Sequence, residues 1–155
     1  MYKKILVPLD GSELAECVLP HVEAVVQGCR VAEVIFIRVL EPVDIPEATE
    51  FALAPENIIE KSLEFRRADA ENYFETVREK FPLPGSRAEW RVEMGKAPET
   101  IAQFGLNQGV DLIIISTHGR SGVSRWVWGS VADRVLRSSC VPVLMVRAPG
   151  CAAGF

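Results

Sequence analysis

The chain has 155 residues, the usual length of one domain, and we expect a single domain over residues 1–155. About half of it is apolar (48%) and a quarter is charged (25%), which excludes wholesale disorder, and four cysteines are too few for a disulfide scaffold. A net charge of -4 argues against nucleic-acid binding driven by overall basic charge, and no apolar run reaches the roughly 18 residues of a membrane helix.

The first third of the chain predicts a strand, a helix and a second strand. Residues 3–9 form a short, branched apolar run that ends at Asp10 and a glycine, which is typical of a buried strand followed by a turn. A helix is predicted over 12–27, because a serine can cap its start and two glutamates suit its first turn. We expect a kink at Pro20. The Val- and Ile-rich segment 32–40 predicts the second strand.

The middle of the chain contains an acidic, proline-rich stretch, a long helix and an alternating strand. Residues 41–57 are long for a structureless connection, so we expect either a mobile cover or partly helical structure. Helical spacing of apolar residues predicts a long amphipathic helix over 56–80. Residues 86–95 alternate between apolar and charged side chains, which predicts a strand with one wet face at a sheet edge.

The last third predicts a helix over 97–109, a strand over 111–116, a helix over 123–138 and a strand over 141–147. The strand 111–116 is the most apolar, and we expect it to be central. Strands that alternate with helices at this spacing imply right-handed crossovers and a parallel sheet. The predicted fold class is therefore α/β: an open five-stranded parallel sheet, doubly wound, with helices on both faces. Ligands of such sheets bind beyond the carboxyl ends of the strands.

The richest chemistry lies just after the strand 111–116. Residues 116–125 contain glycines, hydroxyls and two arginines, and Gly129 and Ser130 follow shortly after. Backbone N–H groups, hydroxyls and a helix N-terminus together suit a phosphate. The segment is not a Walker A loop, because no Gly-Lys-Ser/Thr follows it. From the residues alone, a phosphate cradle and a plain turn are equally good interpretations.

Asp10 and His118 are the other candidates. Asp10 ends the first strand and could accept from a ribose hydroxyl, hold a metal or accept a phosphoryl group, or it could be a turn aspartate bonded to its own backbone. His118 could contact a phosphate or be a simple loop residue, since no triad or metal-ligand set surrounds it. We take His21, the second histidine, as a surface residue.

These segments resemble the universal stress protein family of UspA type. The resemblance rests on ILVPLDGS (5–12), VLEP (39–42), VEMGKAPETI (92–101) and the long block 111–146, and it covers nearly the whole chain except 43–85. ATP-binding members resemble the pattern G-x-x-G, nine residues, G-Ser/Thr. Gly119, the spacer 120–128, Gly129 and Ser130 match it, and Ser116 replaces the first glycine.

The resemblance implies an ATP site. Asp10 would face the ribose or a Mg²⁺ ion carried by the nucleotide, and the backbone of Val39 would meet the adenine edge. The residues that would line the base and sugar are Pro8, Leu9 and Ile115. The residues that would surround the triphosphate are Gly119, Arg120, Gly129, Ser130 and Val131. Ser116 and His118 would also belong to the ATP site.

The resemblance also implies a homodimer through the last strand, from Val141 to Arg147, although that run could instead be a buried terminal strand. We expect a cytoplasmic protein with reduced cysteines that binds neither nucleic acid nor membrane. No dedicated nucleophile or general base is visible, so at most slow ATP hydrolysis or autophosphorylation is expected, with Thr117, Ser124 or Ser130 as acceptors.

Three other functions stay open at this point. The first is an interaction protein that has lost nucleotide, which the replacement of a motif glycine by Ser116 favours. The second is an adenylyl-transferring or pyrophosphatase enzyme, but the first turn lacks the glycine-rich loop that such enzymes use. The third is a receiver domain, but the strand 86–95 offers no phosphoacceptor aspartate at its end.

Overall fold

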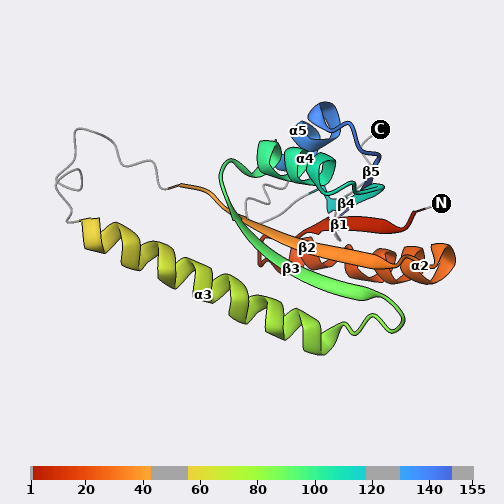
Figure 1. Ribbon diagram of the computed structural model, residues 1–155, viewed down its shortest axis with the longest axis horizontal. Coiled ribbons are helices and arrows are strands. Elements are labelled where there is room, and N and C mark those ends of the chain that lie inside the picture. Colours follow the sequence, from red (N-terminus) through yellow and green to blue (C-terminus); the bar gives the residue numbers. More distant parts are fainter. Residues whose placement is uncertain (1, 43–55, 118–129, 148–155) are drawn as a thin grey trace.

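The computed structural model describes residues 2–42, 56–117 and 130–147, in which strands and helices alternate along the chain (Figure 1). The strands are β1 (Lys4–Pro8), β2 (Glu33–Leu40), β3 (Arg87–Met94), β4 (Leu112–Ser116) and β5 (Val143–Val146). The helices are α1 (Glu13–Glu16), α2 (Leu19–Cys29), α3 (Glu56–Lys80), α4 (Ala97–Asn107) and α5 (Ser130–Ser138).

The five described strands form one parallel sheet in the order β3-β2-β1-β4-β5. The predicted α/β class is thereby confirmed. The prediction that 86–95 is an edge strand is also confirmed, since β3 ends the sheet. The prediction for 111–116 needs a correction. β4 has neighbours on both sides, but the middle of the sheet is β1, because β1 pairs with β2 on one side and β4 on the other.

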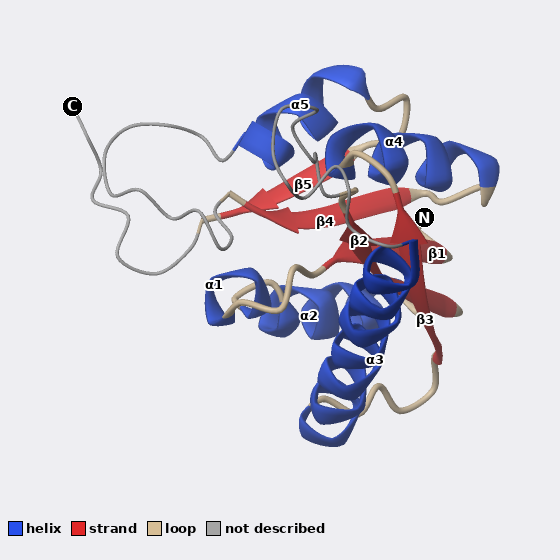
Figure 2. Ribbon diagram, turned by 90° about the vertical axis from the view of Figure 1, so that its left-hand side faces the viewer, coloured by secondary structure: helices blue, strands red, loops and turns tan. Residues whose placement is uncertain are grey.

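Helices cover both faces of the sheet, as Figure 2 shows. Because side chains alternate along a strand, each strand contributes to two apolar clusters. One cluster joins Val7 and Phe36 to α1, α2 and α3, and the other joins Leu6 and Ile113 to α4 and α5. These two clusters are buried on opposite sides of the same strands, which explains why the inner strands read as continuous apolar runs.

The predicted helix 12–27 is two helices, α1 and α2. Ser12 caps α1 as expected, because its Oγ accepts a hydrogen bond from the N–H of Ala15 at 3.2 Å. The helix is interrupted at residues 17–18, before Pro20, and is not kinked at the proline. Pro20 sits in the first turn of α2, where a backbone N–H has no helical partner and its absence costs nothing.

The remaining helices match their predictions closely. α3 spans the predicted residues 56–80, and α4 is followed by Gly109, whose φ of 61° is left-handed. The predicted helix 123–138 is described only from Ser130, and its first part lies outside the described residues. His21 is exposed, as predicted. Among the described residues, no helix is long and apolar enough to cross a membrane, and the cysteines 17, 29 and 140 are free thiols.

Candidate functional site

The topological switch point of the sheet lies between β1 and β4. The chain that leaves β1 forms α1 and α2 on one face, whereas α5, which follows β4, packs on the other face. In Figure 2, α1, the first turn of α5 and the arrowheads of β4 and β5 lie on the same side of the molecule. Doubly wound sheets bind their ligands at this position, beyond the carboxyl ends of the strands.

Asp10 is held at the end of β1 by a tight turn. Its Oδ1 accepts hydrogen bonds from the backbone N–H of Ser12 at 2.9 Å and from the Ser12 hydroxyl at 2.6 Å. Gly11 has a φ of 86°, a left-handed conformation that glycine adopts without strain. The turn and the helix cap therefore share Ser12, and together they orient the Asp10 carboxylate. The side chain of Asp10 is half-buried.

Ser116 and Thr117 place two hydroxyls at the end of β4. Both residues are buried, with exposures of 7% and 5%. Ser116 is in register with Val146 on β5, and the N–H of Thr117 donates to the carbonyl of Val146 at 2.8 Å. The β4–β5 pairing thus continues one residue past the end of β4 and holds these hydroxyls beside the switch point.

Three of the apolar residues predicted to line the site meet in one cluster. Ile115 is a buried member of the cluster under α4 and α5, and Val39 and Val131 pack against it. Pro8 is in register with Ile37, two residues before Val39, so the ends of β1 and β2 lie side by side. Val39 of β2, Ile115 of β4 and Val131 of α5 therefore form an apolar wall next to the switch point, and the end of β1 lies beside it.

Leu9 lies elsewhere. Its N–H donates to the carbonyl of Ile37 at 2.9 Å, and its side chain packs into the opposite cluster, with Ala15 and Ile114. Any contact of Leu9 with a ligand at the apolar wall would come from its backbone. The side chain points away because successive residues of a strand face opposite sides of the sheet.

Four of the predicted site residues, His118, Gly119, Arg120 and Gly129, lie outside the described residues. Ser130 is the first residue of α5. Among the described residues, no group of three or more histidine, cysteine, aspartate or glutamate side chains is arranged to hold a metal ion. Within that part of the chain, Asp10 is therefore a single candidate ligand and not part of a metal cluster.

Arg38 and Tyr73 are polar residues near the switch point that the sequence analysis missed. Arg38 on β2 is only 5% exposed, pairs with Asp69 on α3 at 2.9 Å and lies 5.5 Å from the centre of the Tyr73 ring. The Tyr73 hydroxyl is buried without a hydrogen-bond partner among the described residues. Burial, followed by the negative charges of Glu16 and Asp10, raises the pKa of Tyr73 well above its usual range. The sequence signal that could have identified this pair is an arginine within an otherwise apolar strand.

Comparisons with known proteins agree with this fold. The universal stress protein family matches the chain over residues 1–147. Universal stress protein MJ0577 of Methanocaldococcus jannaschii is 31% identical over 95% of this chain and 96% of its own length. The solved structure of MJ0577 superposes with a TM-score of 0.80 at 30% identity and covers 97% of this chain and 99% of that one.

Two more distant structures share the fold and were solved with nucleotides. A universal stress protein in complex with cAMP has a TM-score of 0.61 at 18% identity, with 95% of this chain and 98% of that chain covered. A family protein from Arabidopsis thaliana with AMP bound has a TM-score of 0.62 at 14% identity, with 96% and 93% covered.

The sheet order defines a doubly wound α/β protein. Its polar groups place the candidate ligand site at the carboxyl ends of β1 and β4. Because the family match covers almost the full length and the MJ0577 relative exceeds 30% identity, the chain belongs to the universal stress protein family.

Proposed function

We propose that this protein binds an adenine nucleotide, ATP, at the switch point and acts as a single-domain stress-response or signalling module with little or no turnover. The observation that carries the proposal is the meeting of three features at adjoining strand ends. These are the anchored Asp10 carboxylate, the buried hydroxyls of Ser116 and Thr117, and the apolar wall that includes Val39 and Ile115. A nucleotide has a sugar, phosphates and a base, and each feature suits one of these groups.

Each group has a proposed binding partner in this chain. Asp10 is an acceptor for ribose hydroxyls and an oxygen ligand for a Mg²⁺ ion that arrives with the phosphates. The apolar wall suits the flat base, with the Val39 backbone at its edge. By the family pattern, the phosphates would lie near Gly119, Gly129 and Ser130. Ser130 is the first residue of α5, and the N-terminus of a helix favours an anion.

The relatives support the nucleotide class. One family member was solved with cAMP and another with AMP, and both ligands contain adenosine and a phosphate. We extend that class to this chain and propose ATP because of the Gly119, Gly129 and Ser130 spacing. We also propose that the protein works in the cytoplasm, which agrees with free thiols at positions 17, 29 and 140.

The first test needs no variant. The protein is purified without added nucleotide and denatured, and the supernatant is analysed by ion-exchange chromatography against adenine nucleotide standards. Near-stoichiometric ATP or ADP would support the proposal. An empty protein that also releases no heat on titration with Mg-ATP would contradict it.

Asp10→Asn is the sharpest variant for affinity. The amide oxygen can still accept the two hydrogen bonds from Ser12, so the turn should persist while the charge is lost. We expect calorimetry to show about tenfold weaker Mg-ATP binding, the loss of roughly one charge-assisted hydrogen bond. Asp111→Asn is the matched control, because Asp111 precedes β4 at the opposite end of the sheet and bonds to the start of β1. Equal affinities in both variants would remove Asp10 from the site.

Gly129→Val tests the phosphate cradle. A branched side chain would fill the space that the phosphates need by the family pattern, so nucleotide binding should be abolished while the fold is retained. The readout is calorimetry together with far-UV circular dichroism. Unchanged affinity would mean that the cradle is elsewhere.

A second candidate function is an interaction protein that binds no nucleotide and forms homodimers through β5. Two observations favour it: Ser116 replaces the first motif glycine, and Leu144 on the edge strand β5 is 37% exposed. An unpaired apolar edge is a place where a second copy can add a strand. An empty protein that gives no heat with Mg-ATP but loses a dimeric mass on Leu144→Lys substitution would support this function over the first.

A further inference from the structure

The outer edge of β3 is unpaired in the part of the chain that the structure describes. β3 ends the sheet, so no described strand pairs with its second side. Figure 1 is seen from this side: β3 is the nearest strand, and α3 lies below it and not in front of it. Figure 2, turned by 90°, agrees, because α3 covers a face of the sheet and does not cover the edge of β3.

Hydrogen bonds at the two ends of β3 show which of its backbone groups point toward β2 and which point outward. The N–H of Arg87 donates to Ala32 at 2.9 Å, and the N–H of Gly95 donates to Leu40 at 3.1 Å. Both acceptors lie on the β2 side, so the odd-numbered residues of β3 bond inward. Because hydrogen-bonding groups alternate sides along a strand, the N–H and C=O groups of the even-numbered residues point outward. The outward set is Ala88, Trp90, Val92 and Met94.

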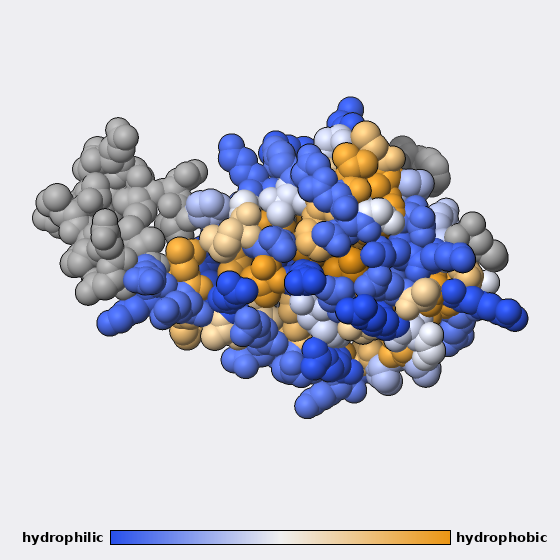
Figure 3. All heavy atoms as spheres, in the orientation of Figure 1, coloured by the Kyte–Doolittle hydropathy of each residue, from blue (hydrophilic) through white to orange (hydrophobic). Residues whose placement is uncertain are grey.

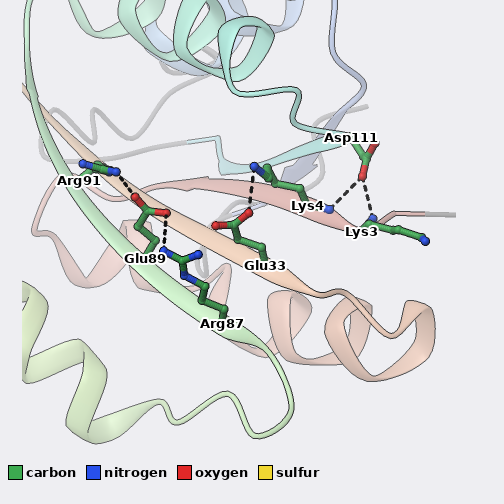
Figure 4. Close-up of polar contacts among 7 residues, drawn as sticks. All are labelled: Lys3, Lys4, Glu33, Arg87, Glu89, Arg91 and Asp111. Carbon is green, nitrogen blue, oxygen red and sulfur yellow. Dashed lines mark hydrogen bonds and ion pairs between the residues drawn. The ribbon is translucent and has the colours of Figure 1, made fainter.

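The odd-numbered residues carry alternating charges on the face opposite α3. Their sequence is Arg87, Glu89, Arg91 and Glu93. Figure 4 shows Glu89 between the two arginines, to which it is paired along the strand. Glu89 is 20% exposed, whereas Arg87 and Arg91 are 76% and 54% exposed. The edge therefore presents alternating charges and not the uniform charge that would repel a second strand.

This pattern is complementary to itself when the strand is reversed. In an antiparallel pair with a two-fold axis at Trp90, Glu89 faces Arg91 of the second copy, and Arg87 faces Glu93 of the second copy. The backbone N–H and C=O groups of Trp90 point outward. In this register they face the same groups of Trp90 in the second copy, and the two residues form a hydrogen-bonded pair. The charged residues occupy the non-hydrogen-bonded pairs, where opposite side chains are closest.

Other registers are penalised by the same charges. A slip of one residue would place outward groups against inward ones and break the hydrogen bonds. A slip of two keeps the hydrogen bonds but sets Glu89 against Glu89 in one direction and Arg91 against Arg91 in the other. Like charges directly opposite each other destabilise a pair of strands. A slip of four, centred on Ala88 or Val92, also keeps the hydrogen bonds but forms two oppositely charged pairs, whereas the register centred on Trp90 forms four. The register centred on Trp90 is therefore the most favourable.

We infer that the β3 edge is a self-association surface, on which a second copy of this chain adds its own β3 antiparallel in the register centred on Trp90. A groove of about 460 Å³ between α3 and β3, which includes Phe74, Trp90 and Met94 in its lining, adjoins this edge. Met94 is 48% exposed in the single chain. Figure 3 shows apolar spheres among hydrophilic ones on this side of the molecule. The inference does not depend on nucleotide binding.

A charge-swap experiment on the full chain tests the register. In Glu89→Arg alone, and in Arg91→Glu alone, the two central pairs become like-charged, and sedimentation equilibrium should show self-association about tenfold weaker than in the unaltered chain. An equimolar mixture of the two variants restores opposite charges across the axis and should recover the association. Glu23→Arg, an exposed reversal on α2, is the matched control and should associate as the unaltered chain does.

The outcomes separate this surface from a dimer through β5. Association through β5 would be the same in every variant and in the mixture, which would overturn the inference. If both the β3 edge and the β5 edge pair, the protein forms open-ended linear oligomers. The variants should then reduce the mass of these oligomers to that of a dimer. Loss of association in both variants without recovery in the mixture would also overturn the proposed register. Circular dichroism of each variant checks that it is folded.

Discussion

On the face of the sheet that carries α1, α2 and α3, the core contains stacked rings and a buried cation, whereas the core under α4 and α5 is mainly aliphatic. Phe36 stacks on Trp90 with ring centres 4.2 Å apart, and Phe74 lies 5.1 Å from the same ring. The opposite cluster is built mostly of isoleucine and valine, with Phe104 and Met145 packed against it.

The difference between the two faces follows from the helices that pack on them. α3 is long and largely charged, so it needs directional contacts to stay on the sheet, and the aromatic rings and the Arg38–Asp69 pair supply them. α4 and α5 are short helices beside the switch point, where close aliphatic packing suffices. The two faces should therefore respond differently to equivalent substitutions.

The largest expected effect is on the aromatic face. Phe36→Ala removes a fully buried ring and its stack on Trp90, and should lower the free energy of unfolding by about 3–5 kcal/mol. Ile113→Ala, an equally buried truncation on the aliphatic face, should cost about 2–5 kcal/mol. Urea unfolding followed by circular dichroism measures both. A cost for Phe36→Ala that is no larger than the cost for Ile113→Ala would mean that the stack on Trp90 adds no stability.

A smaller effect is expected at the buried cation. Asp69→Ala leaves the Arg38 charge buried without its partner, and should cost about 1–2 kcal/mol, less than for a fully buried pair because Asp69 is 56% exposed. Arg38→Met removes the buried charge itself and should change the stability by less than about 1 kcal/mol. If Arg38→Met is instead the more damaging variant in the same urea assay, the pair stabilises the face directly.

A substitution at Gly105 on α4 tests the aliphatic face by adding a methyl group instead of removing side-chain atoms. A Cβ at this position would meet Ile113 Cδ1 at 3.4 Å and Leu6 Cδ2 at 3.6 Å, which is ordinary contact. Gly105→Ala should therefore gain helix propensity and stabilise the protein by about 0.5 kcal/mol. A raised midpoint of thermal unfolding would confirm it, and a lowered midpoint would show that this face is packed too tightly to accept a methyl group.

An equally small effect lies outside both faces, at Asp111. The backbone N–H groups of Lys3 and Lys4 donate to its carboxylate at 2.7 and 2.9 Å, and they lower its pKa. A lowered pKa in the folded state stabilises the fold above the unfolded pKa of about 3.9, and this contribution is lost as the pH falls through the folded value. Asp111→Asn should cost about 0.5 kcal/mol at neutral pH, since the group is exposed. The difference from the unaltered chain should vanish in acid, and a constant difference would contradict the assignment.

The sequence predicted most elements because their signals are local. α3 was predicted over its observed residues, since a long helix shows its period over many turns. The division between α1 and α2 was not predicted, because Pro20 is compatible with either a kink or a helix start. The neighbouring ends of β1, β2 and β4 could be anticipated only as a fold class, and the packing of Leu9 away from Val39 and Ile115 was not anticipated.

By itself, the sequence determined the alternation of strands and helices, the edge character of β3, the turn at Asp10 and the family resemblance. Each of these depends on neighbouring residues or on a motif of known spacing. Only the tertiary structure decided that β1 takes the middle of the sheet, that Arg38 is buried against Asp69, and which backbone groups of β3 face outward. These features depend on which strands pair and in which register, and pairing is set by long-range burial that no local pattern encodes.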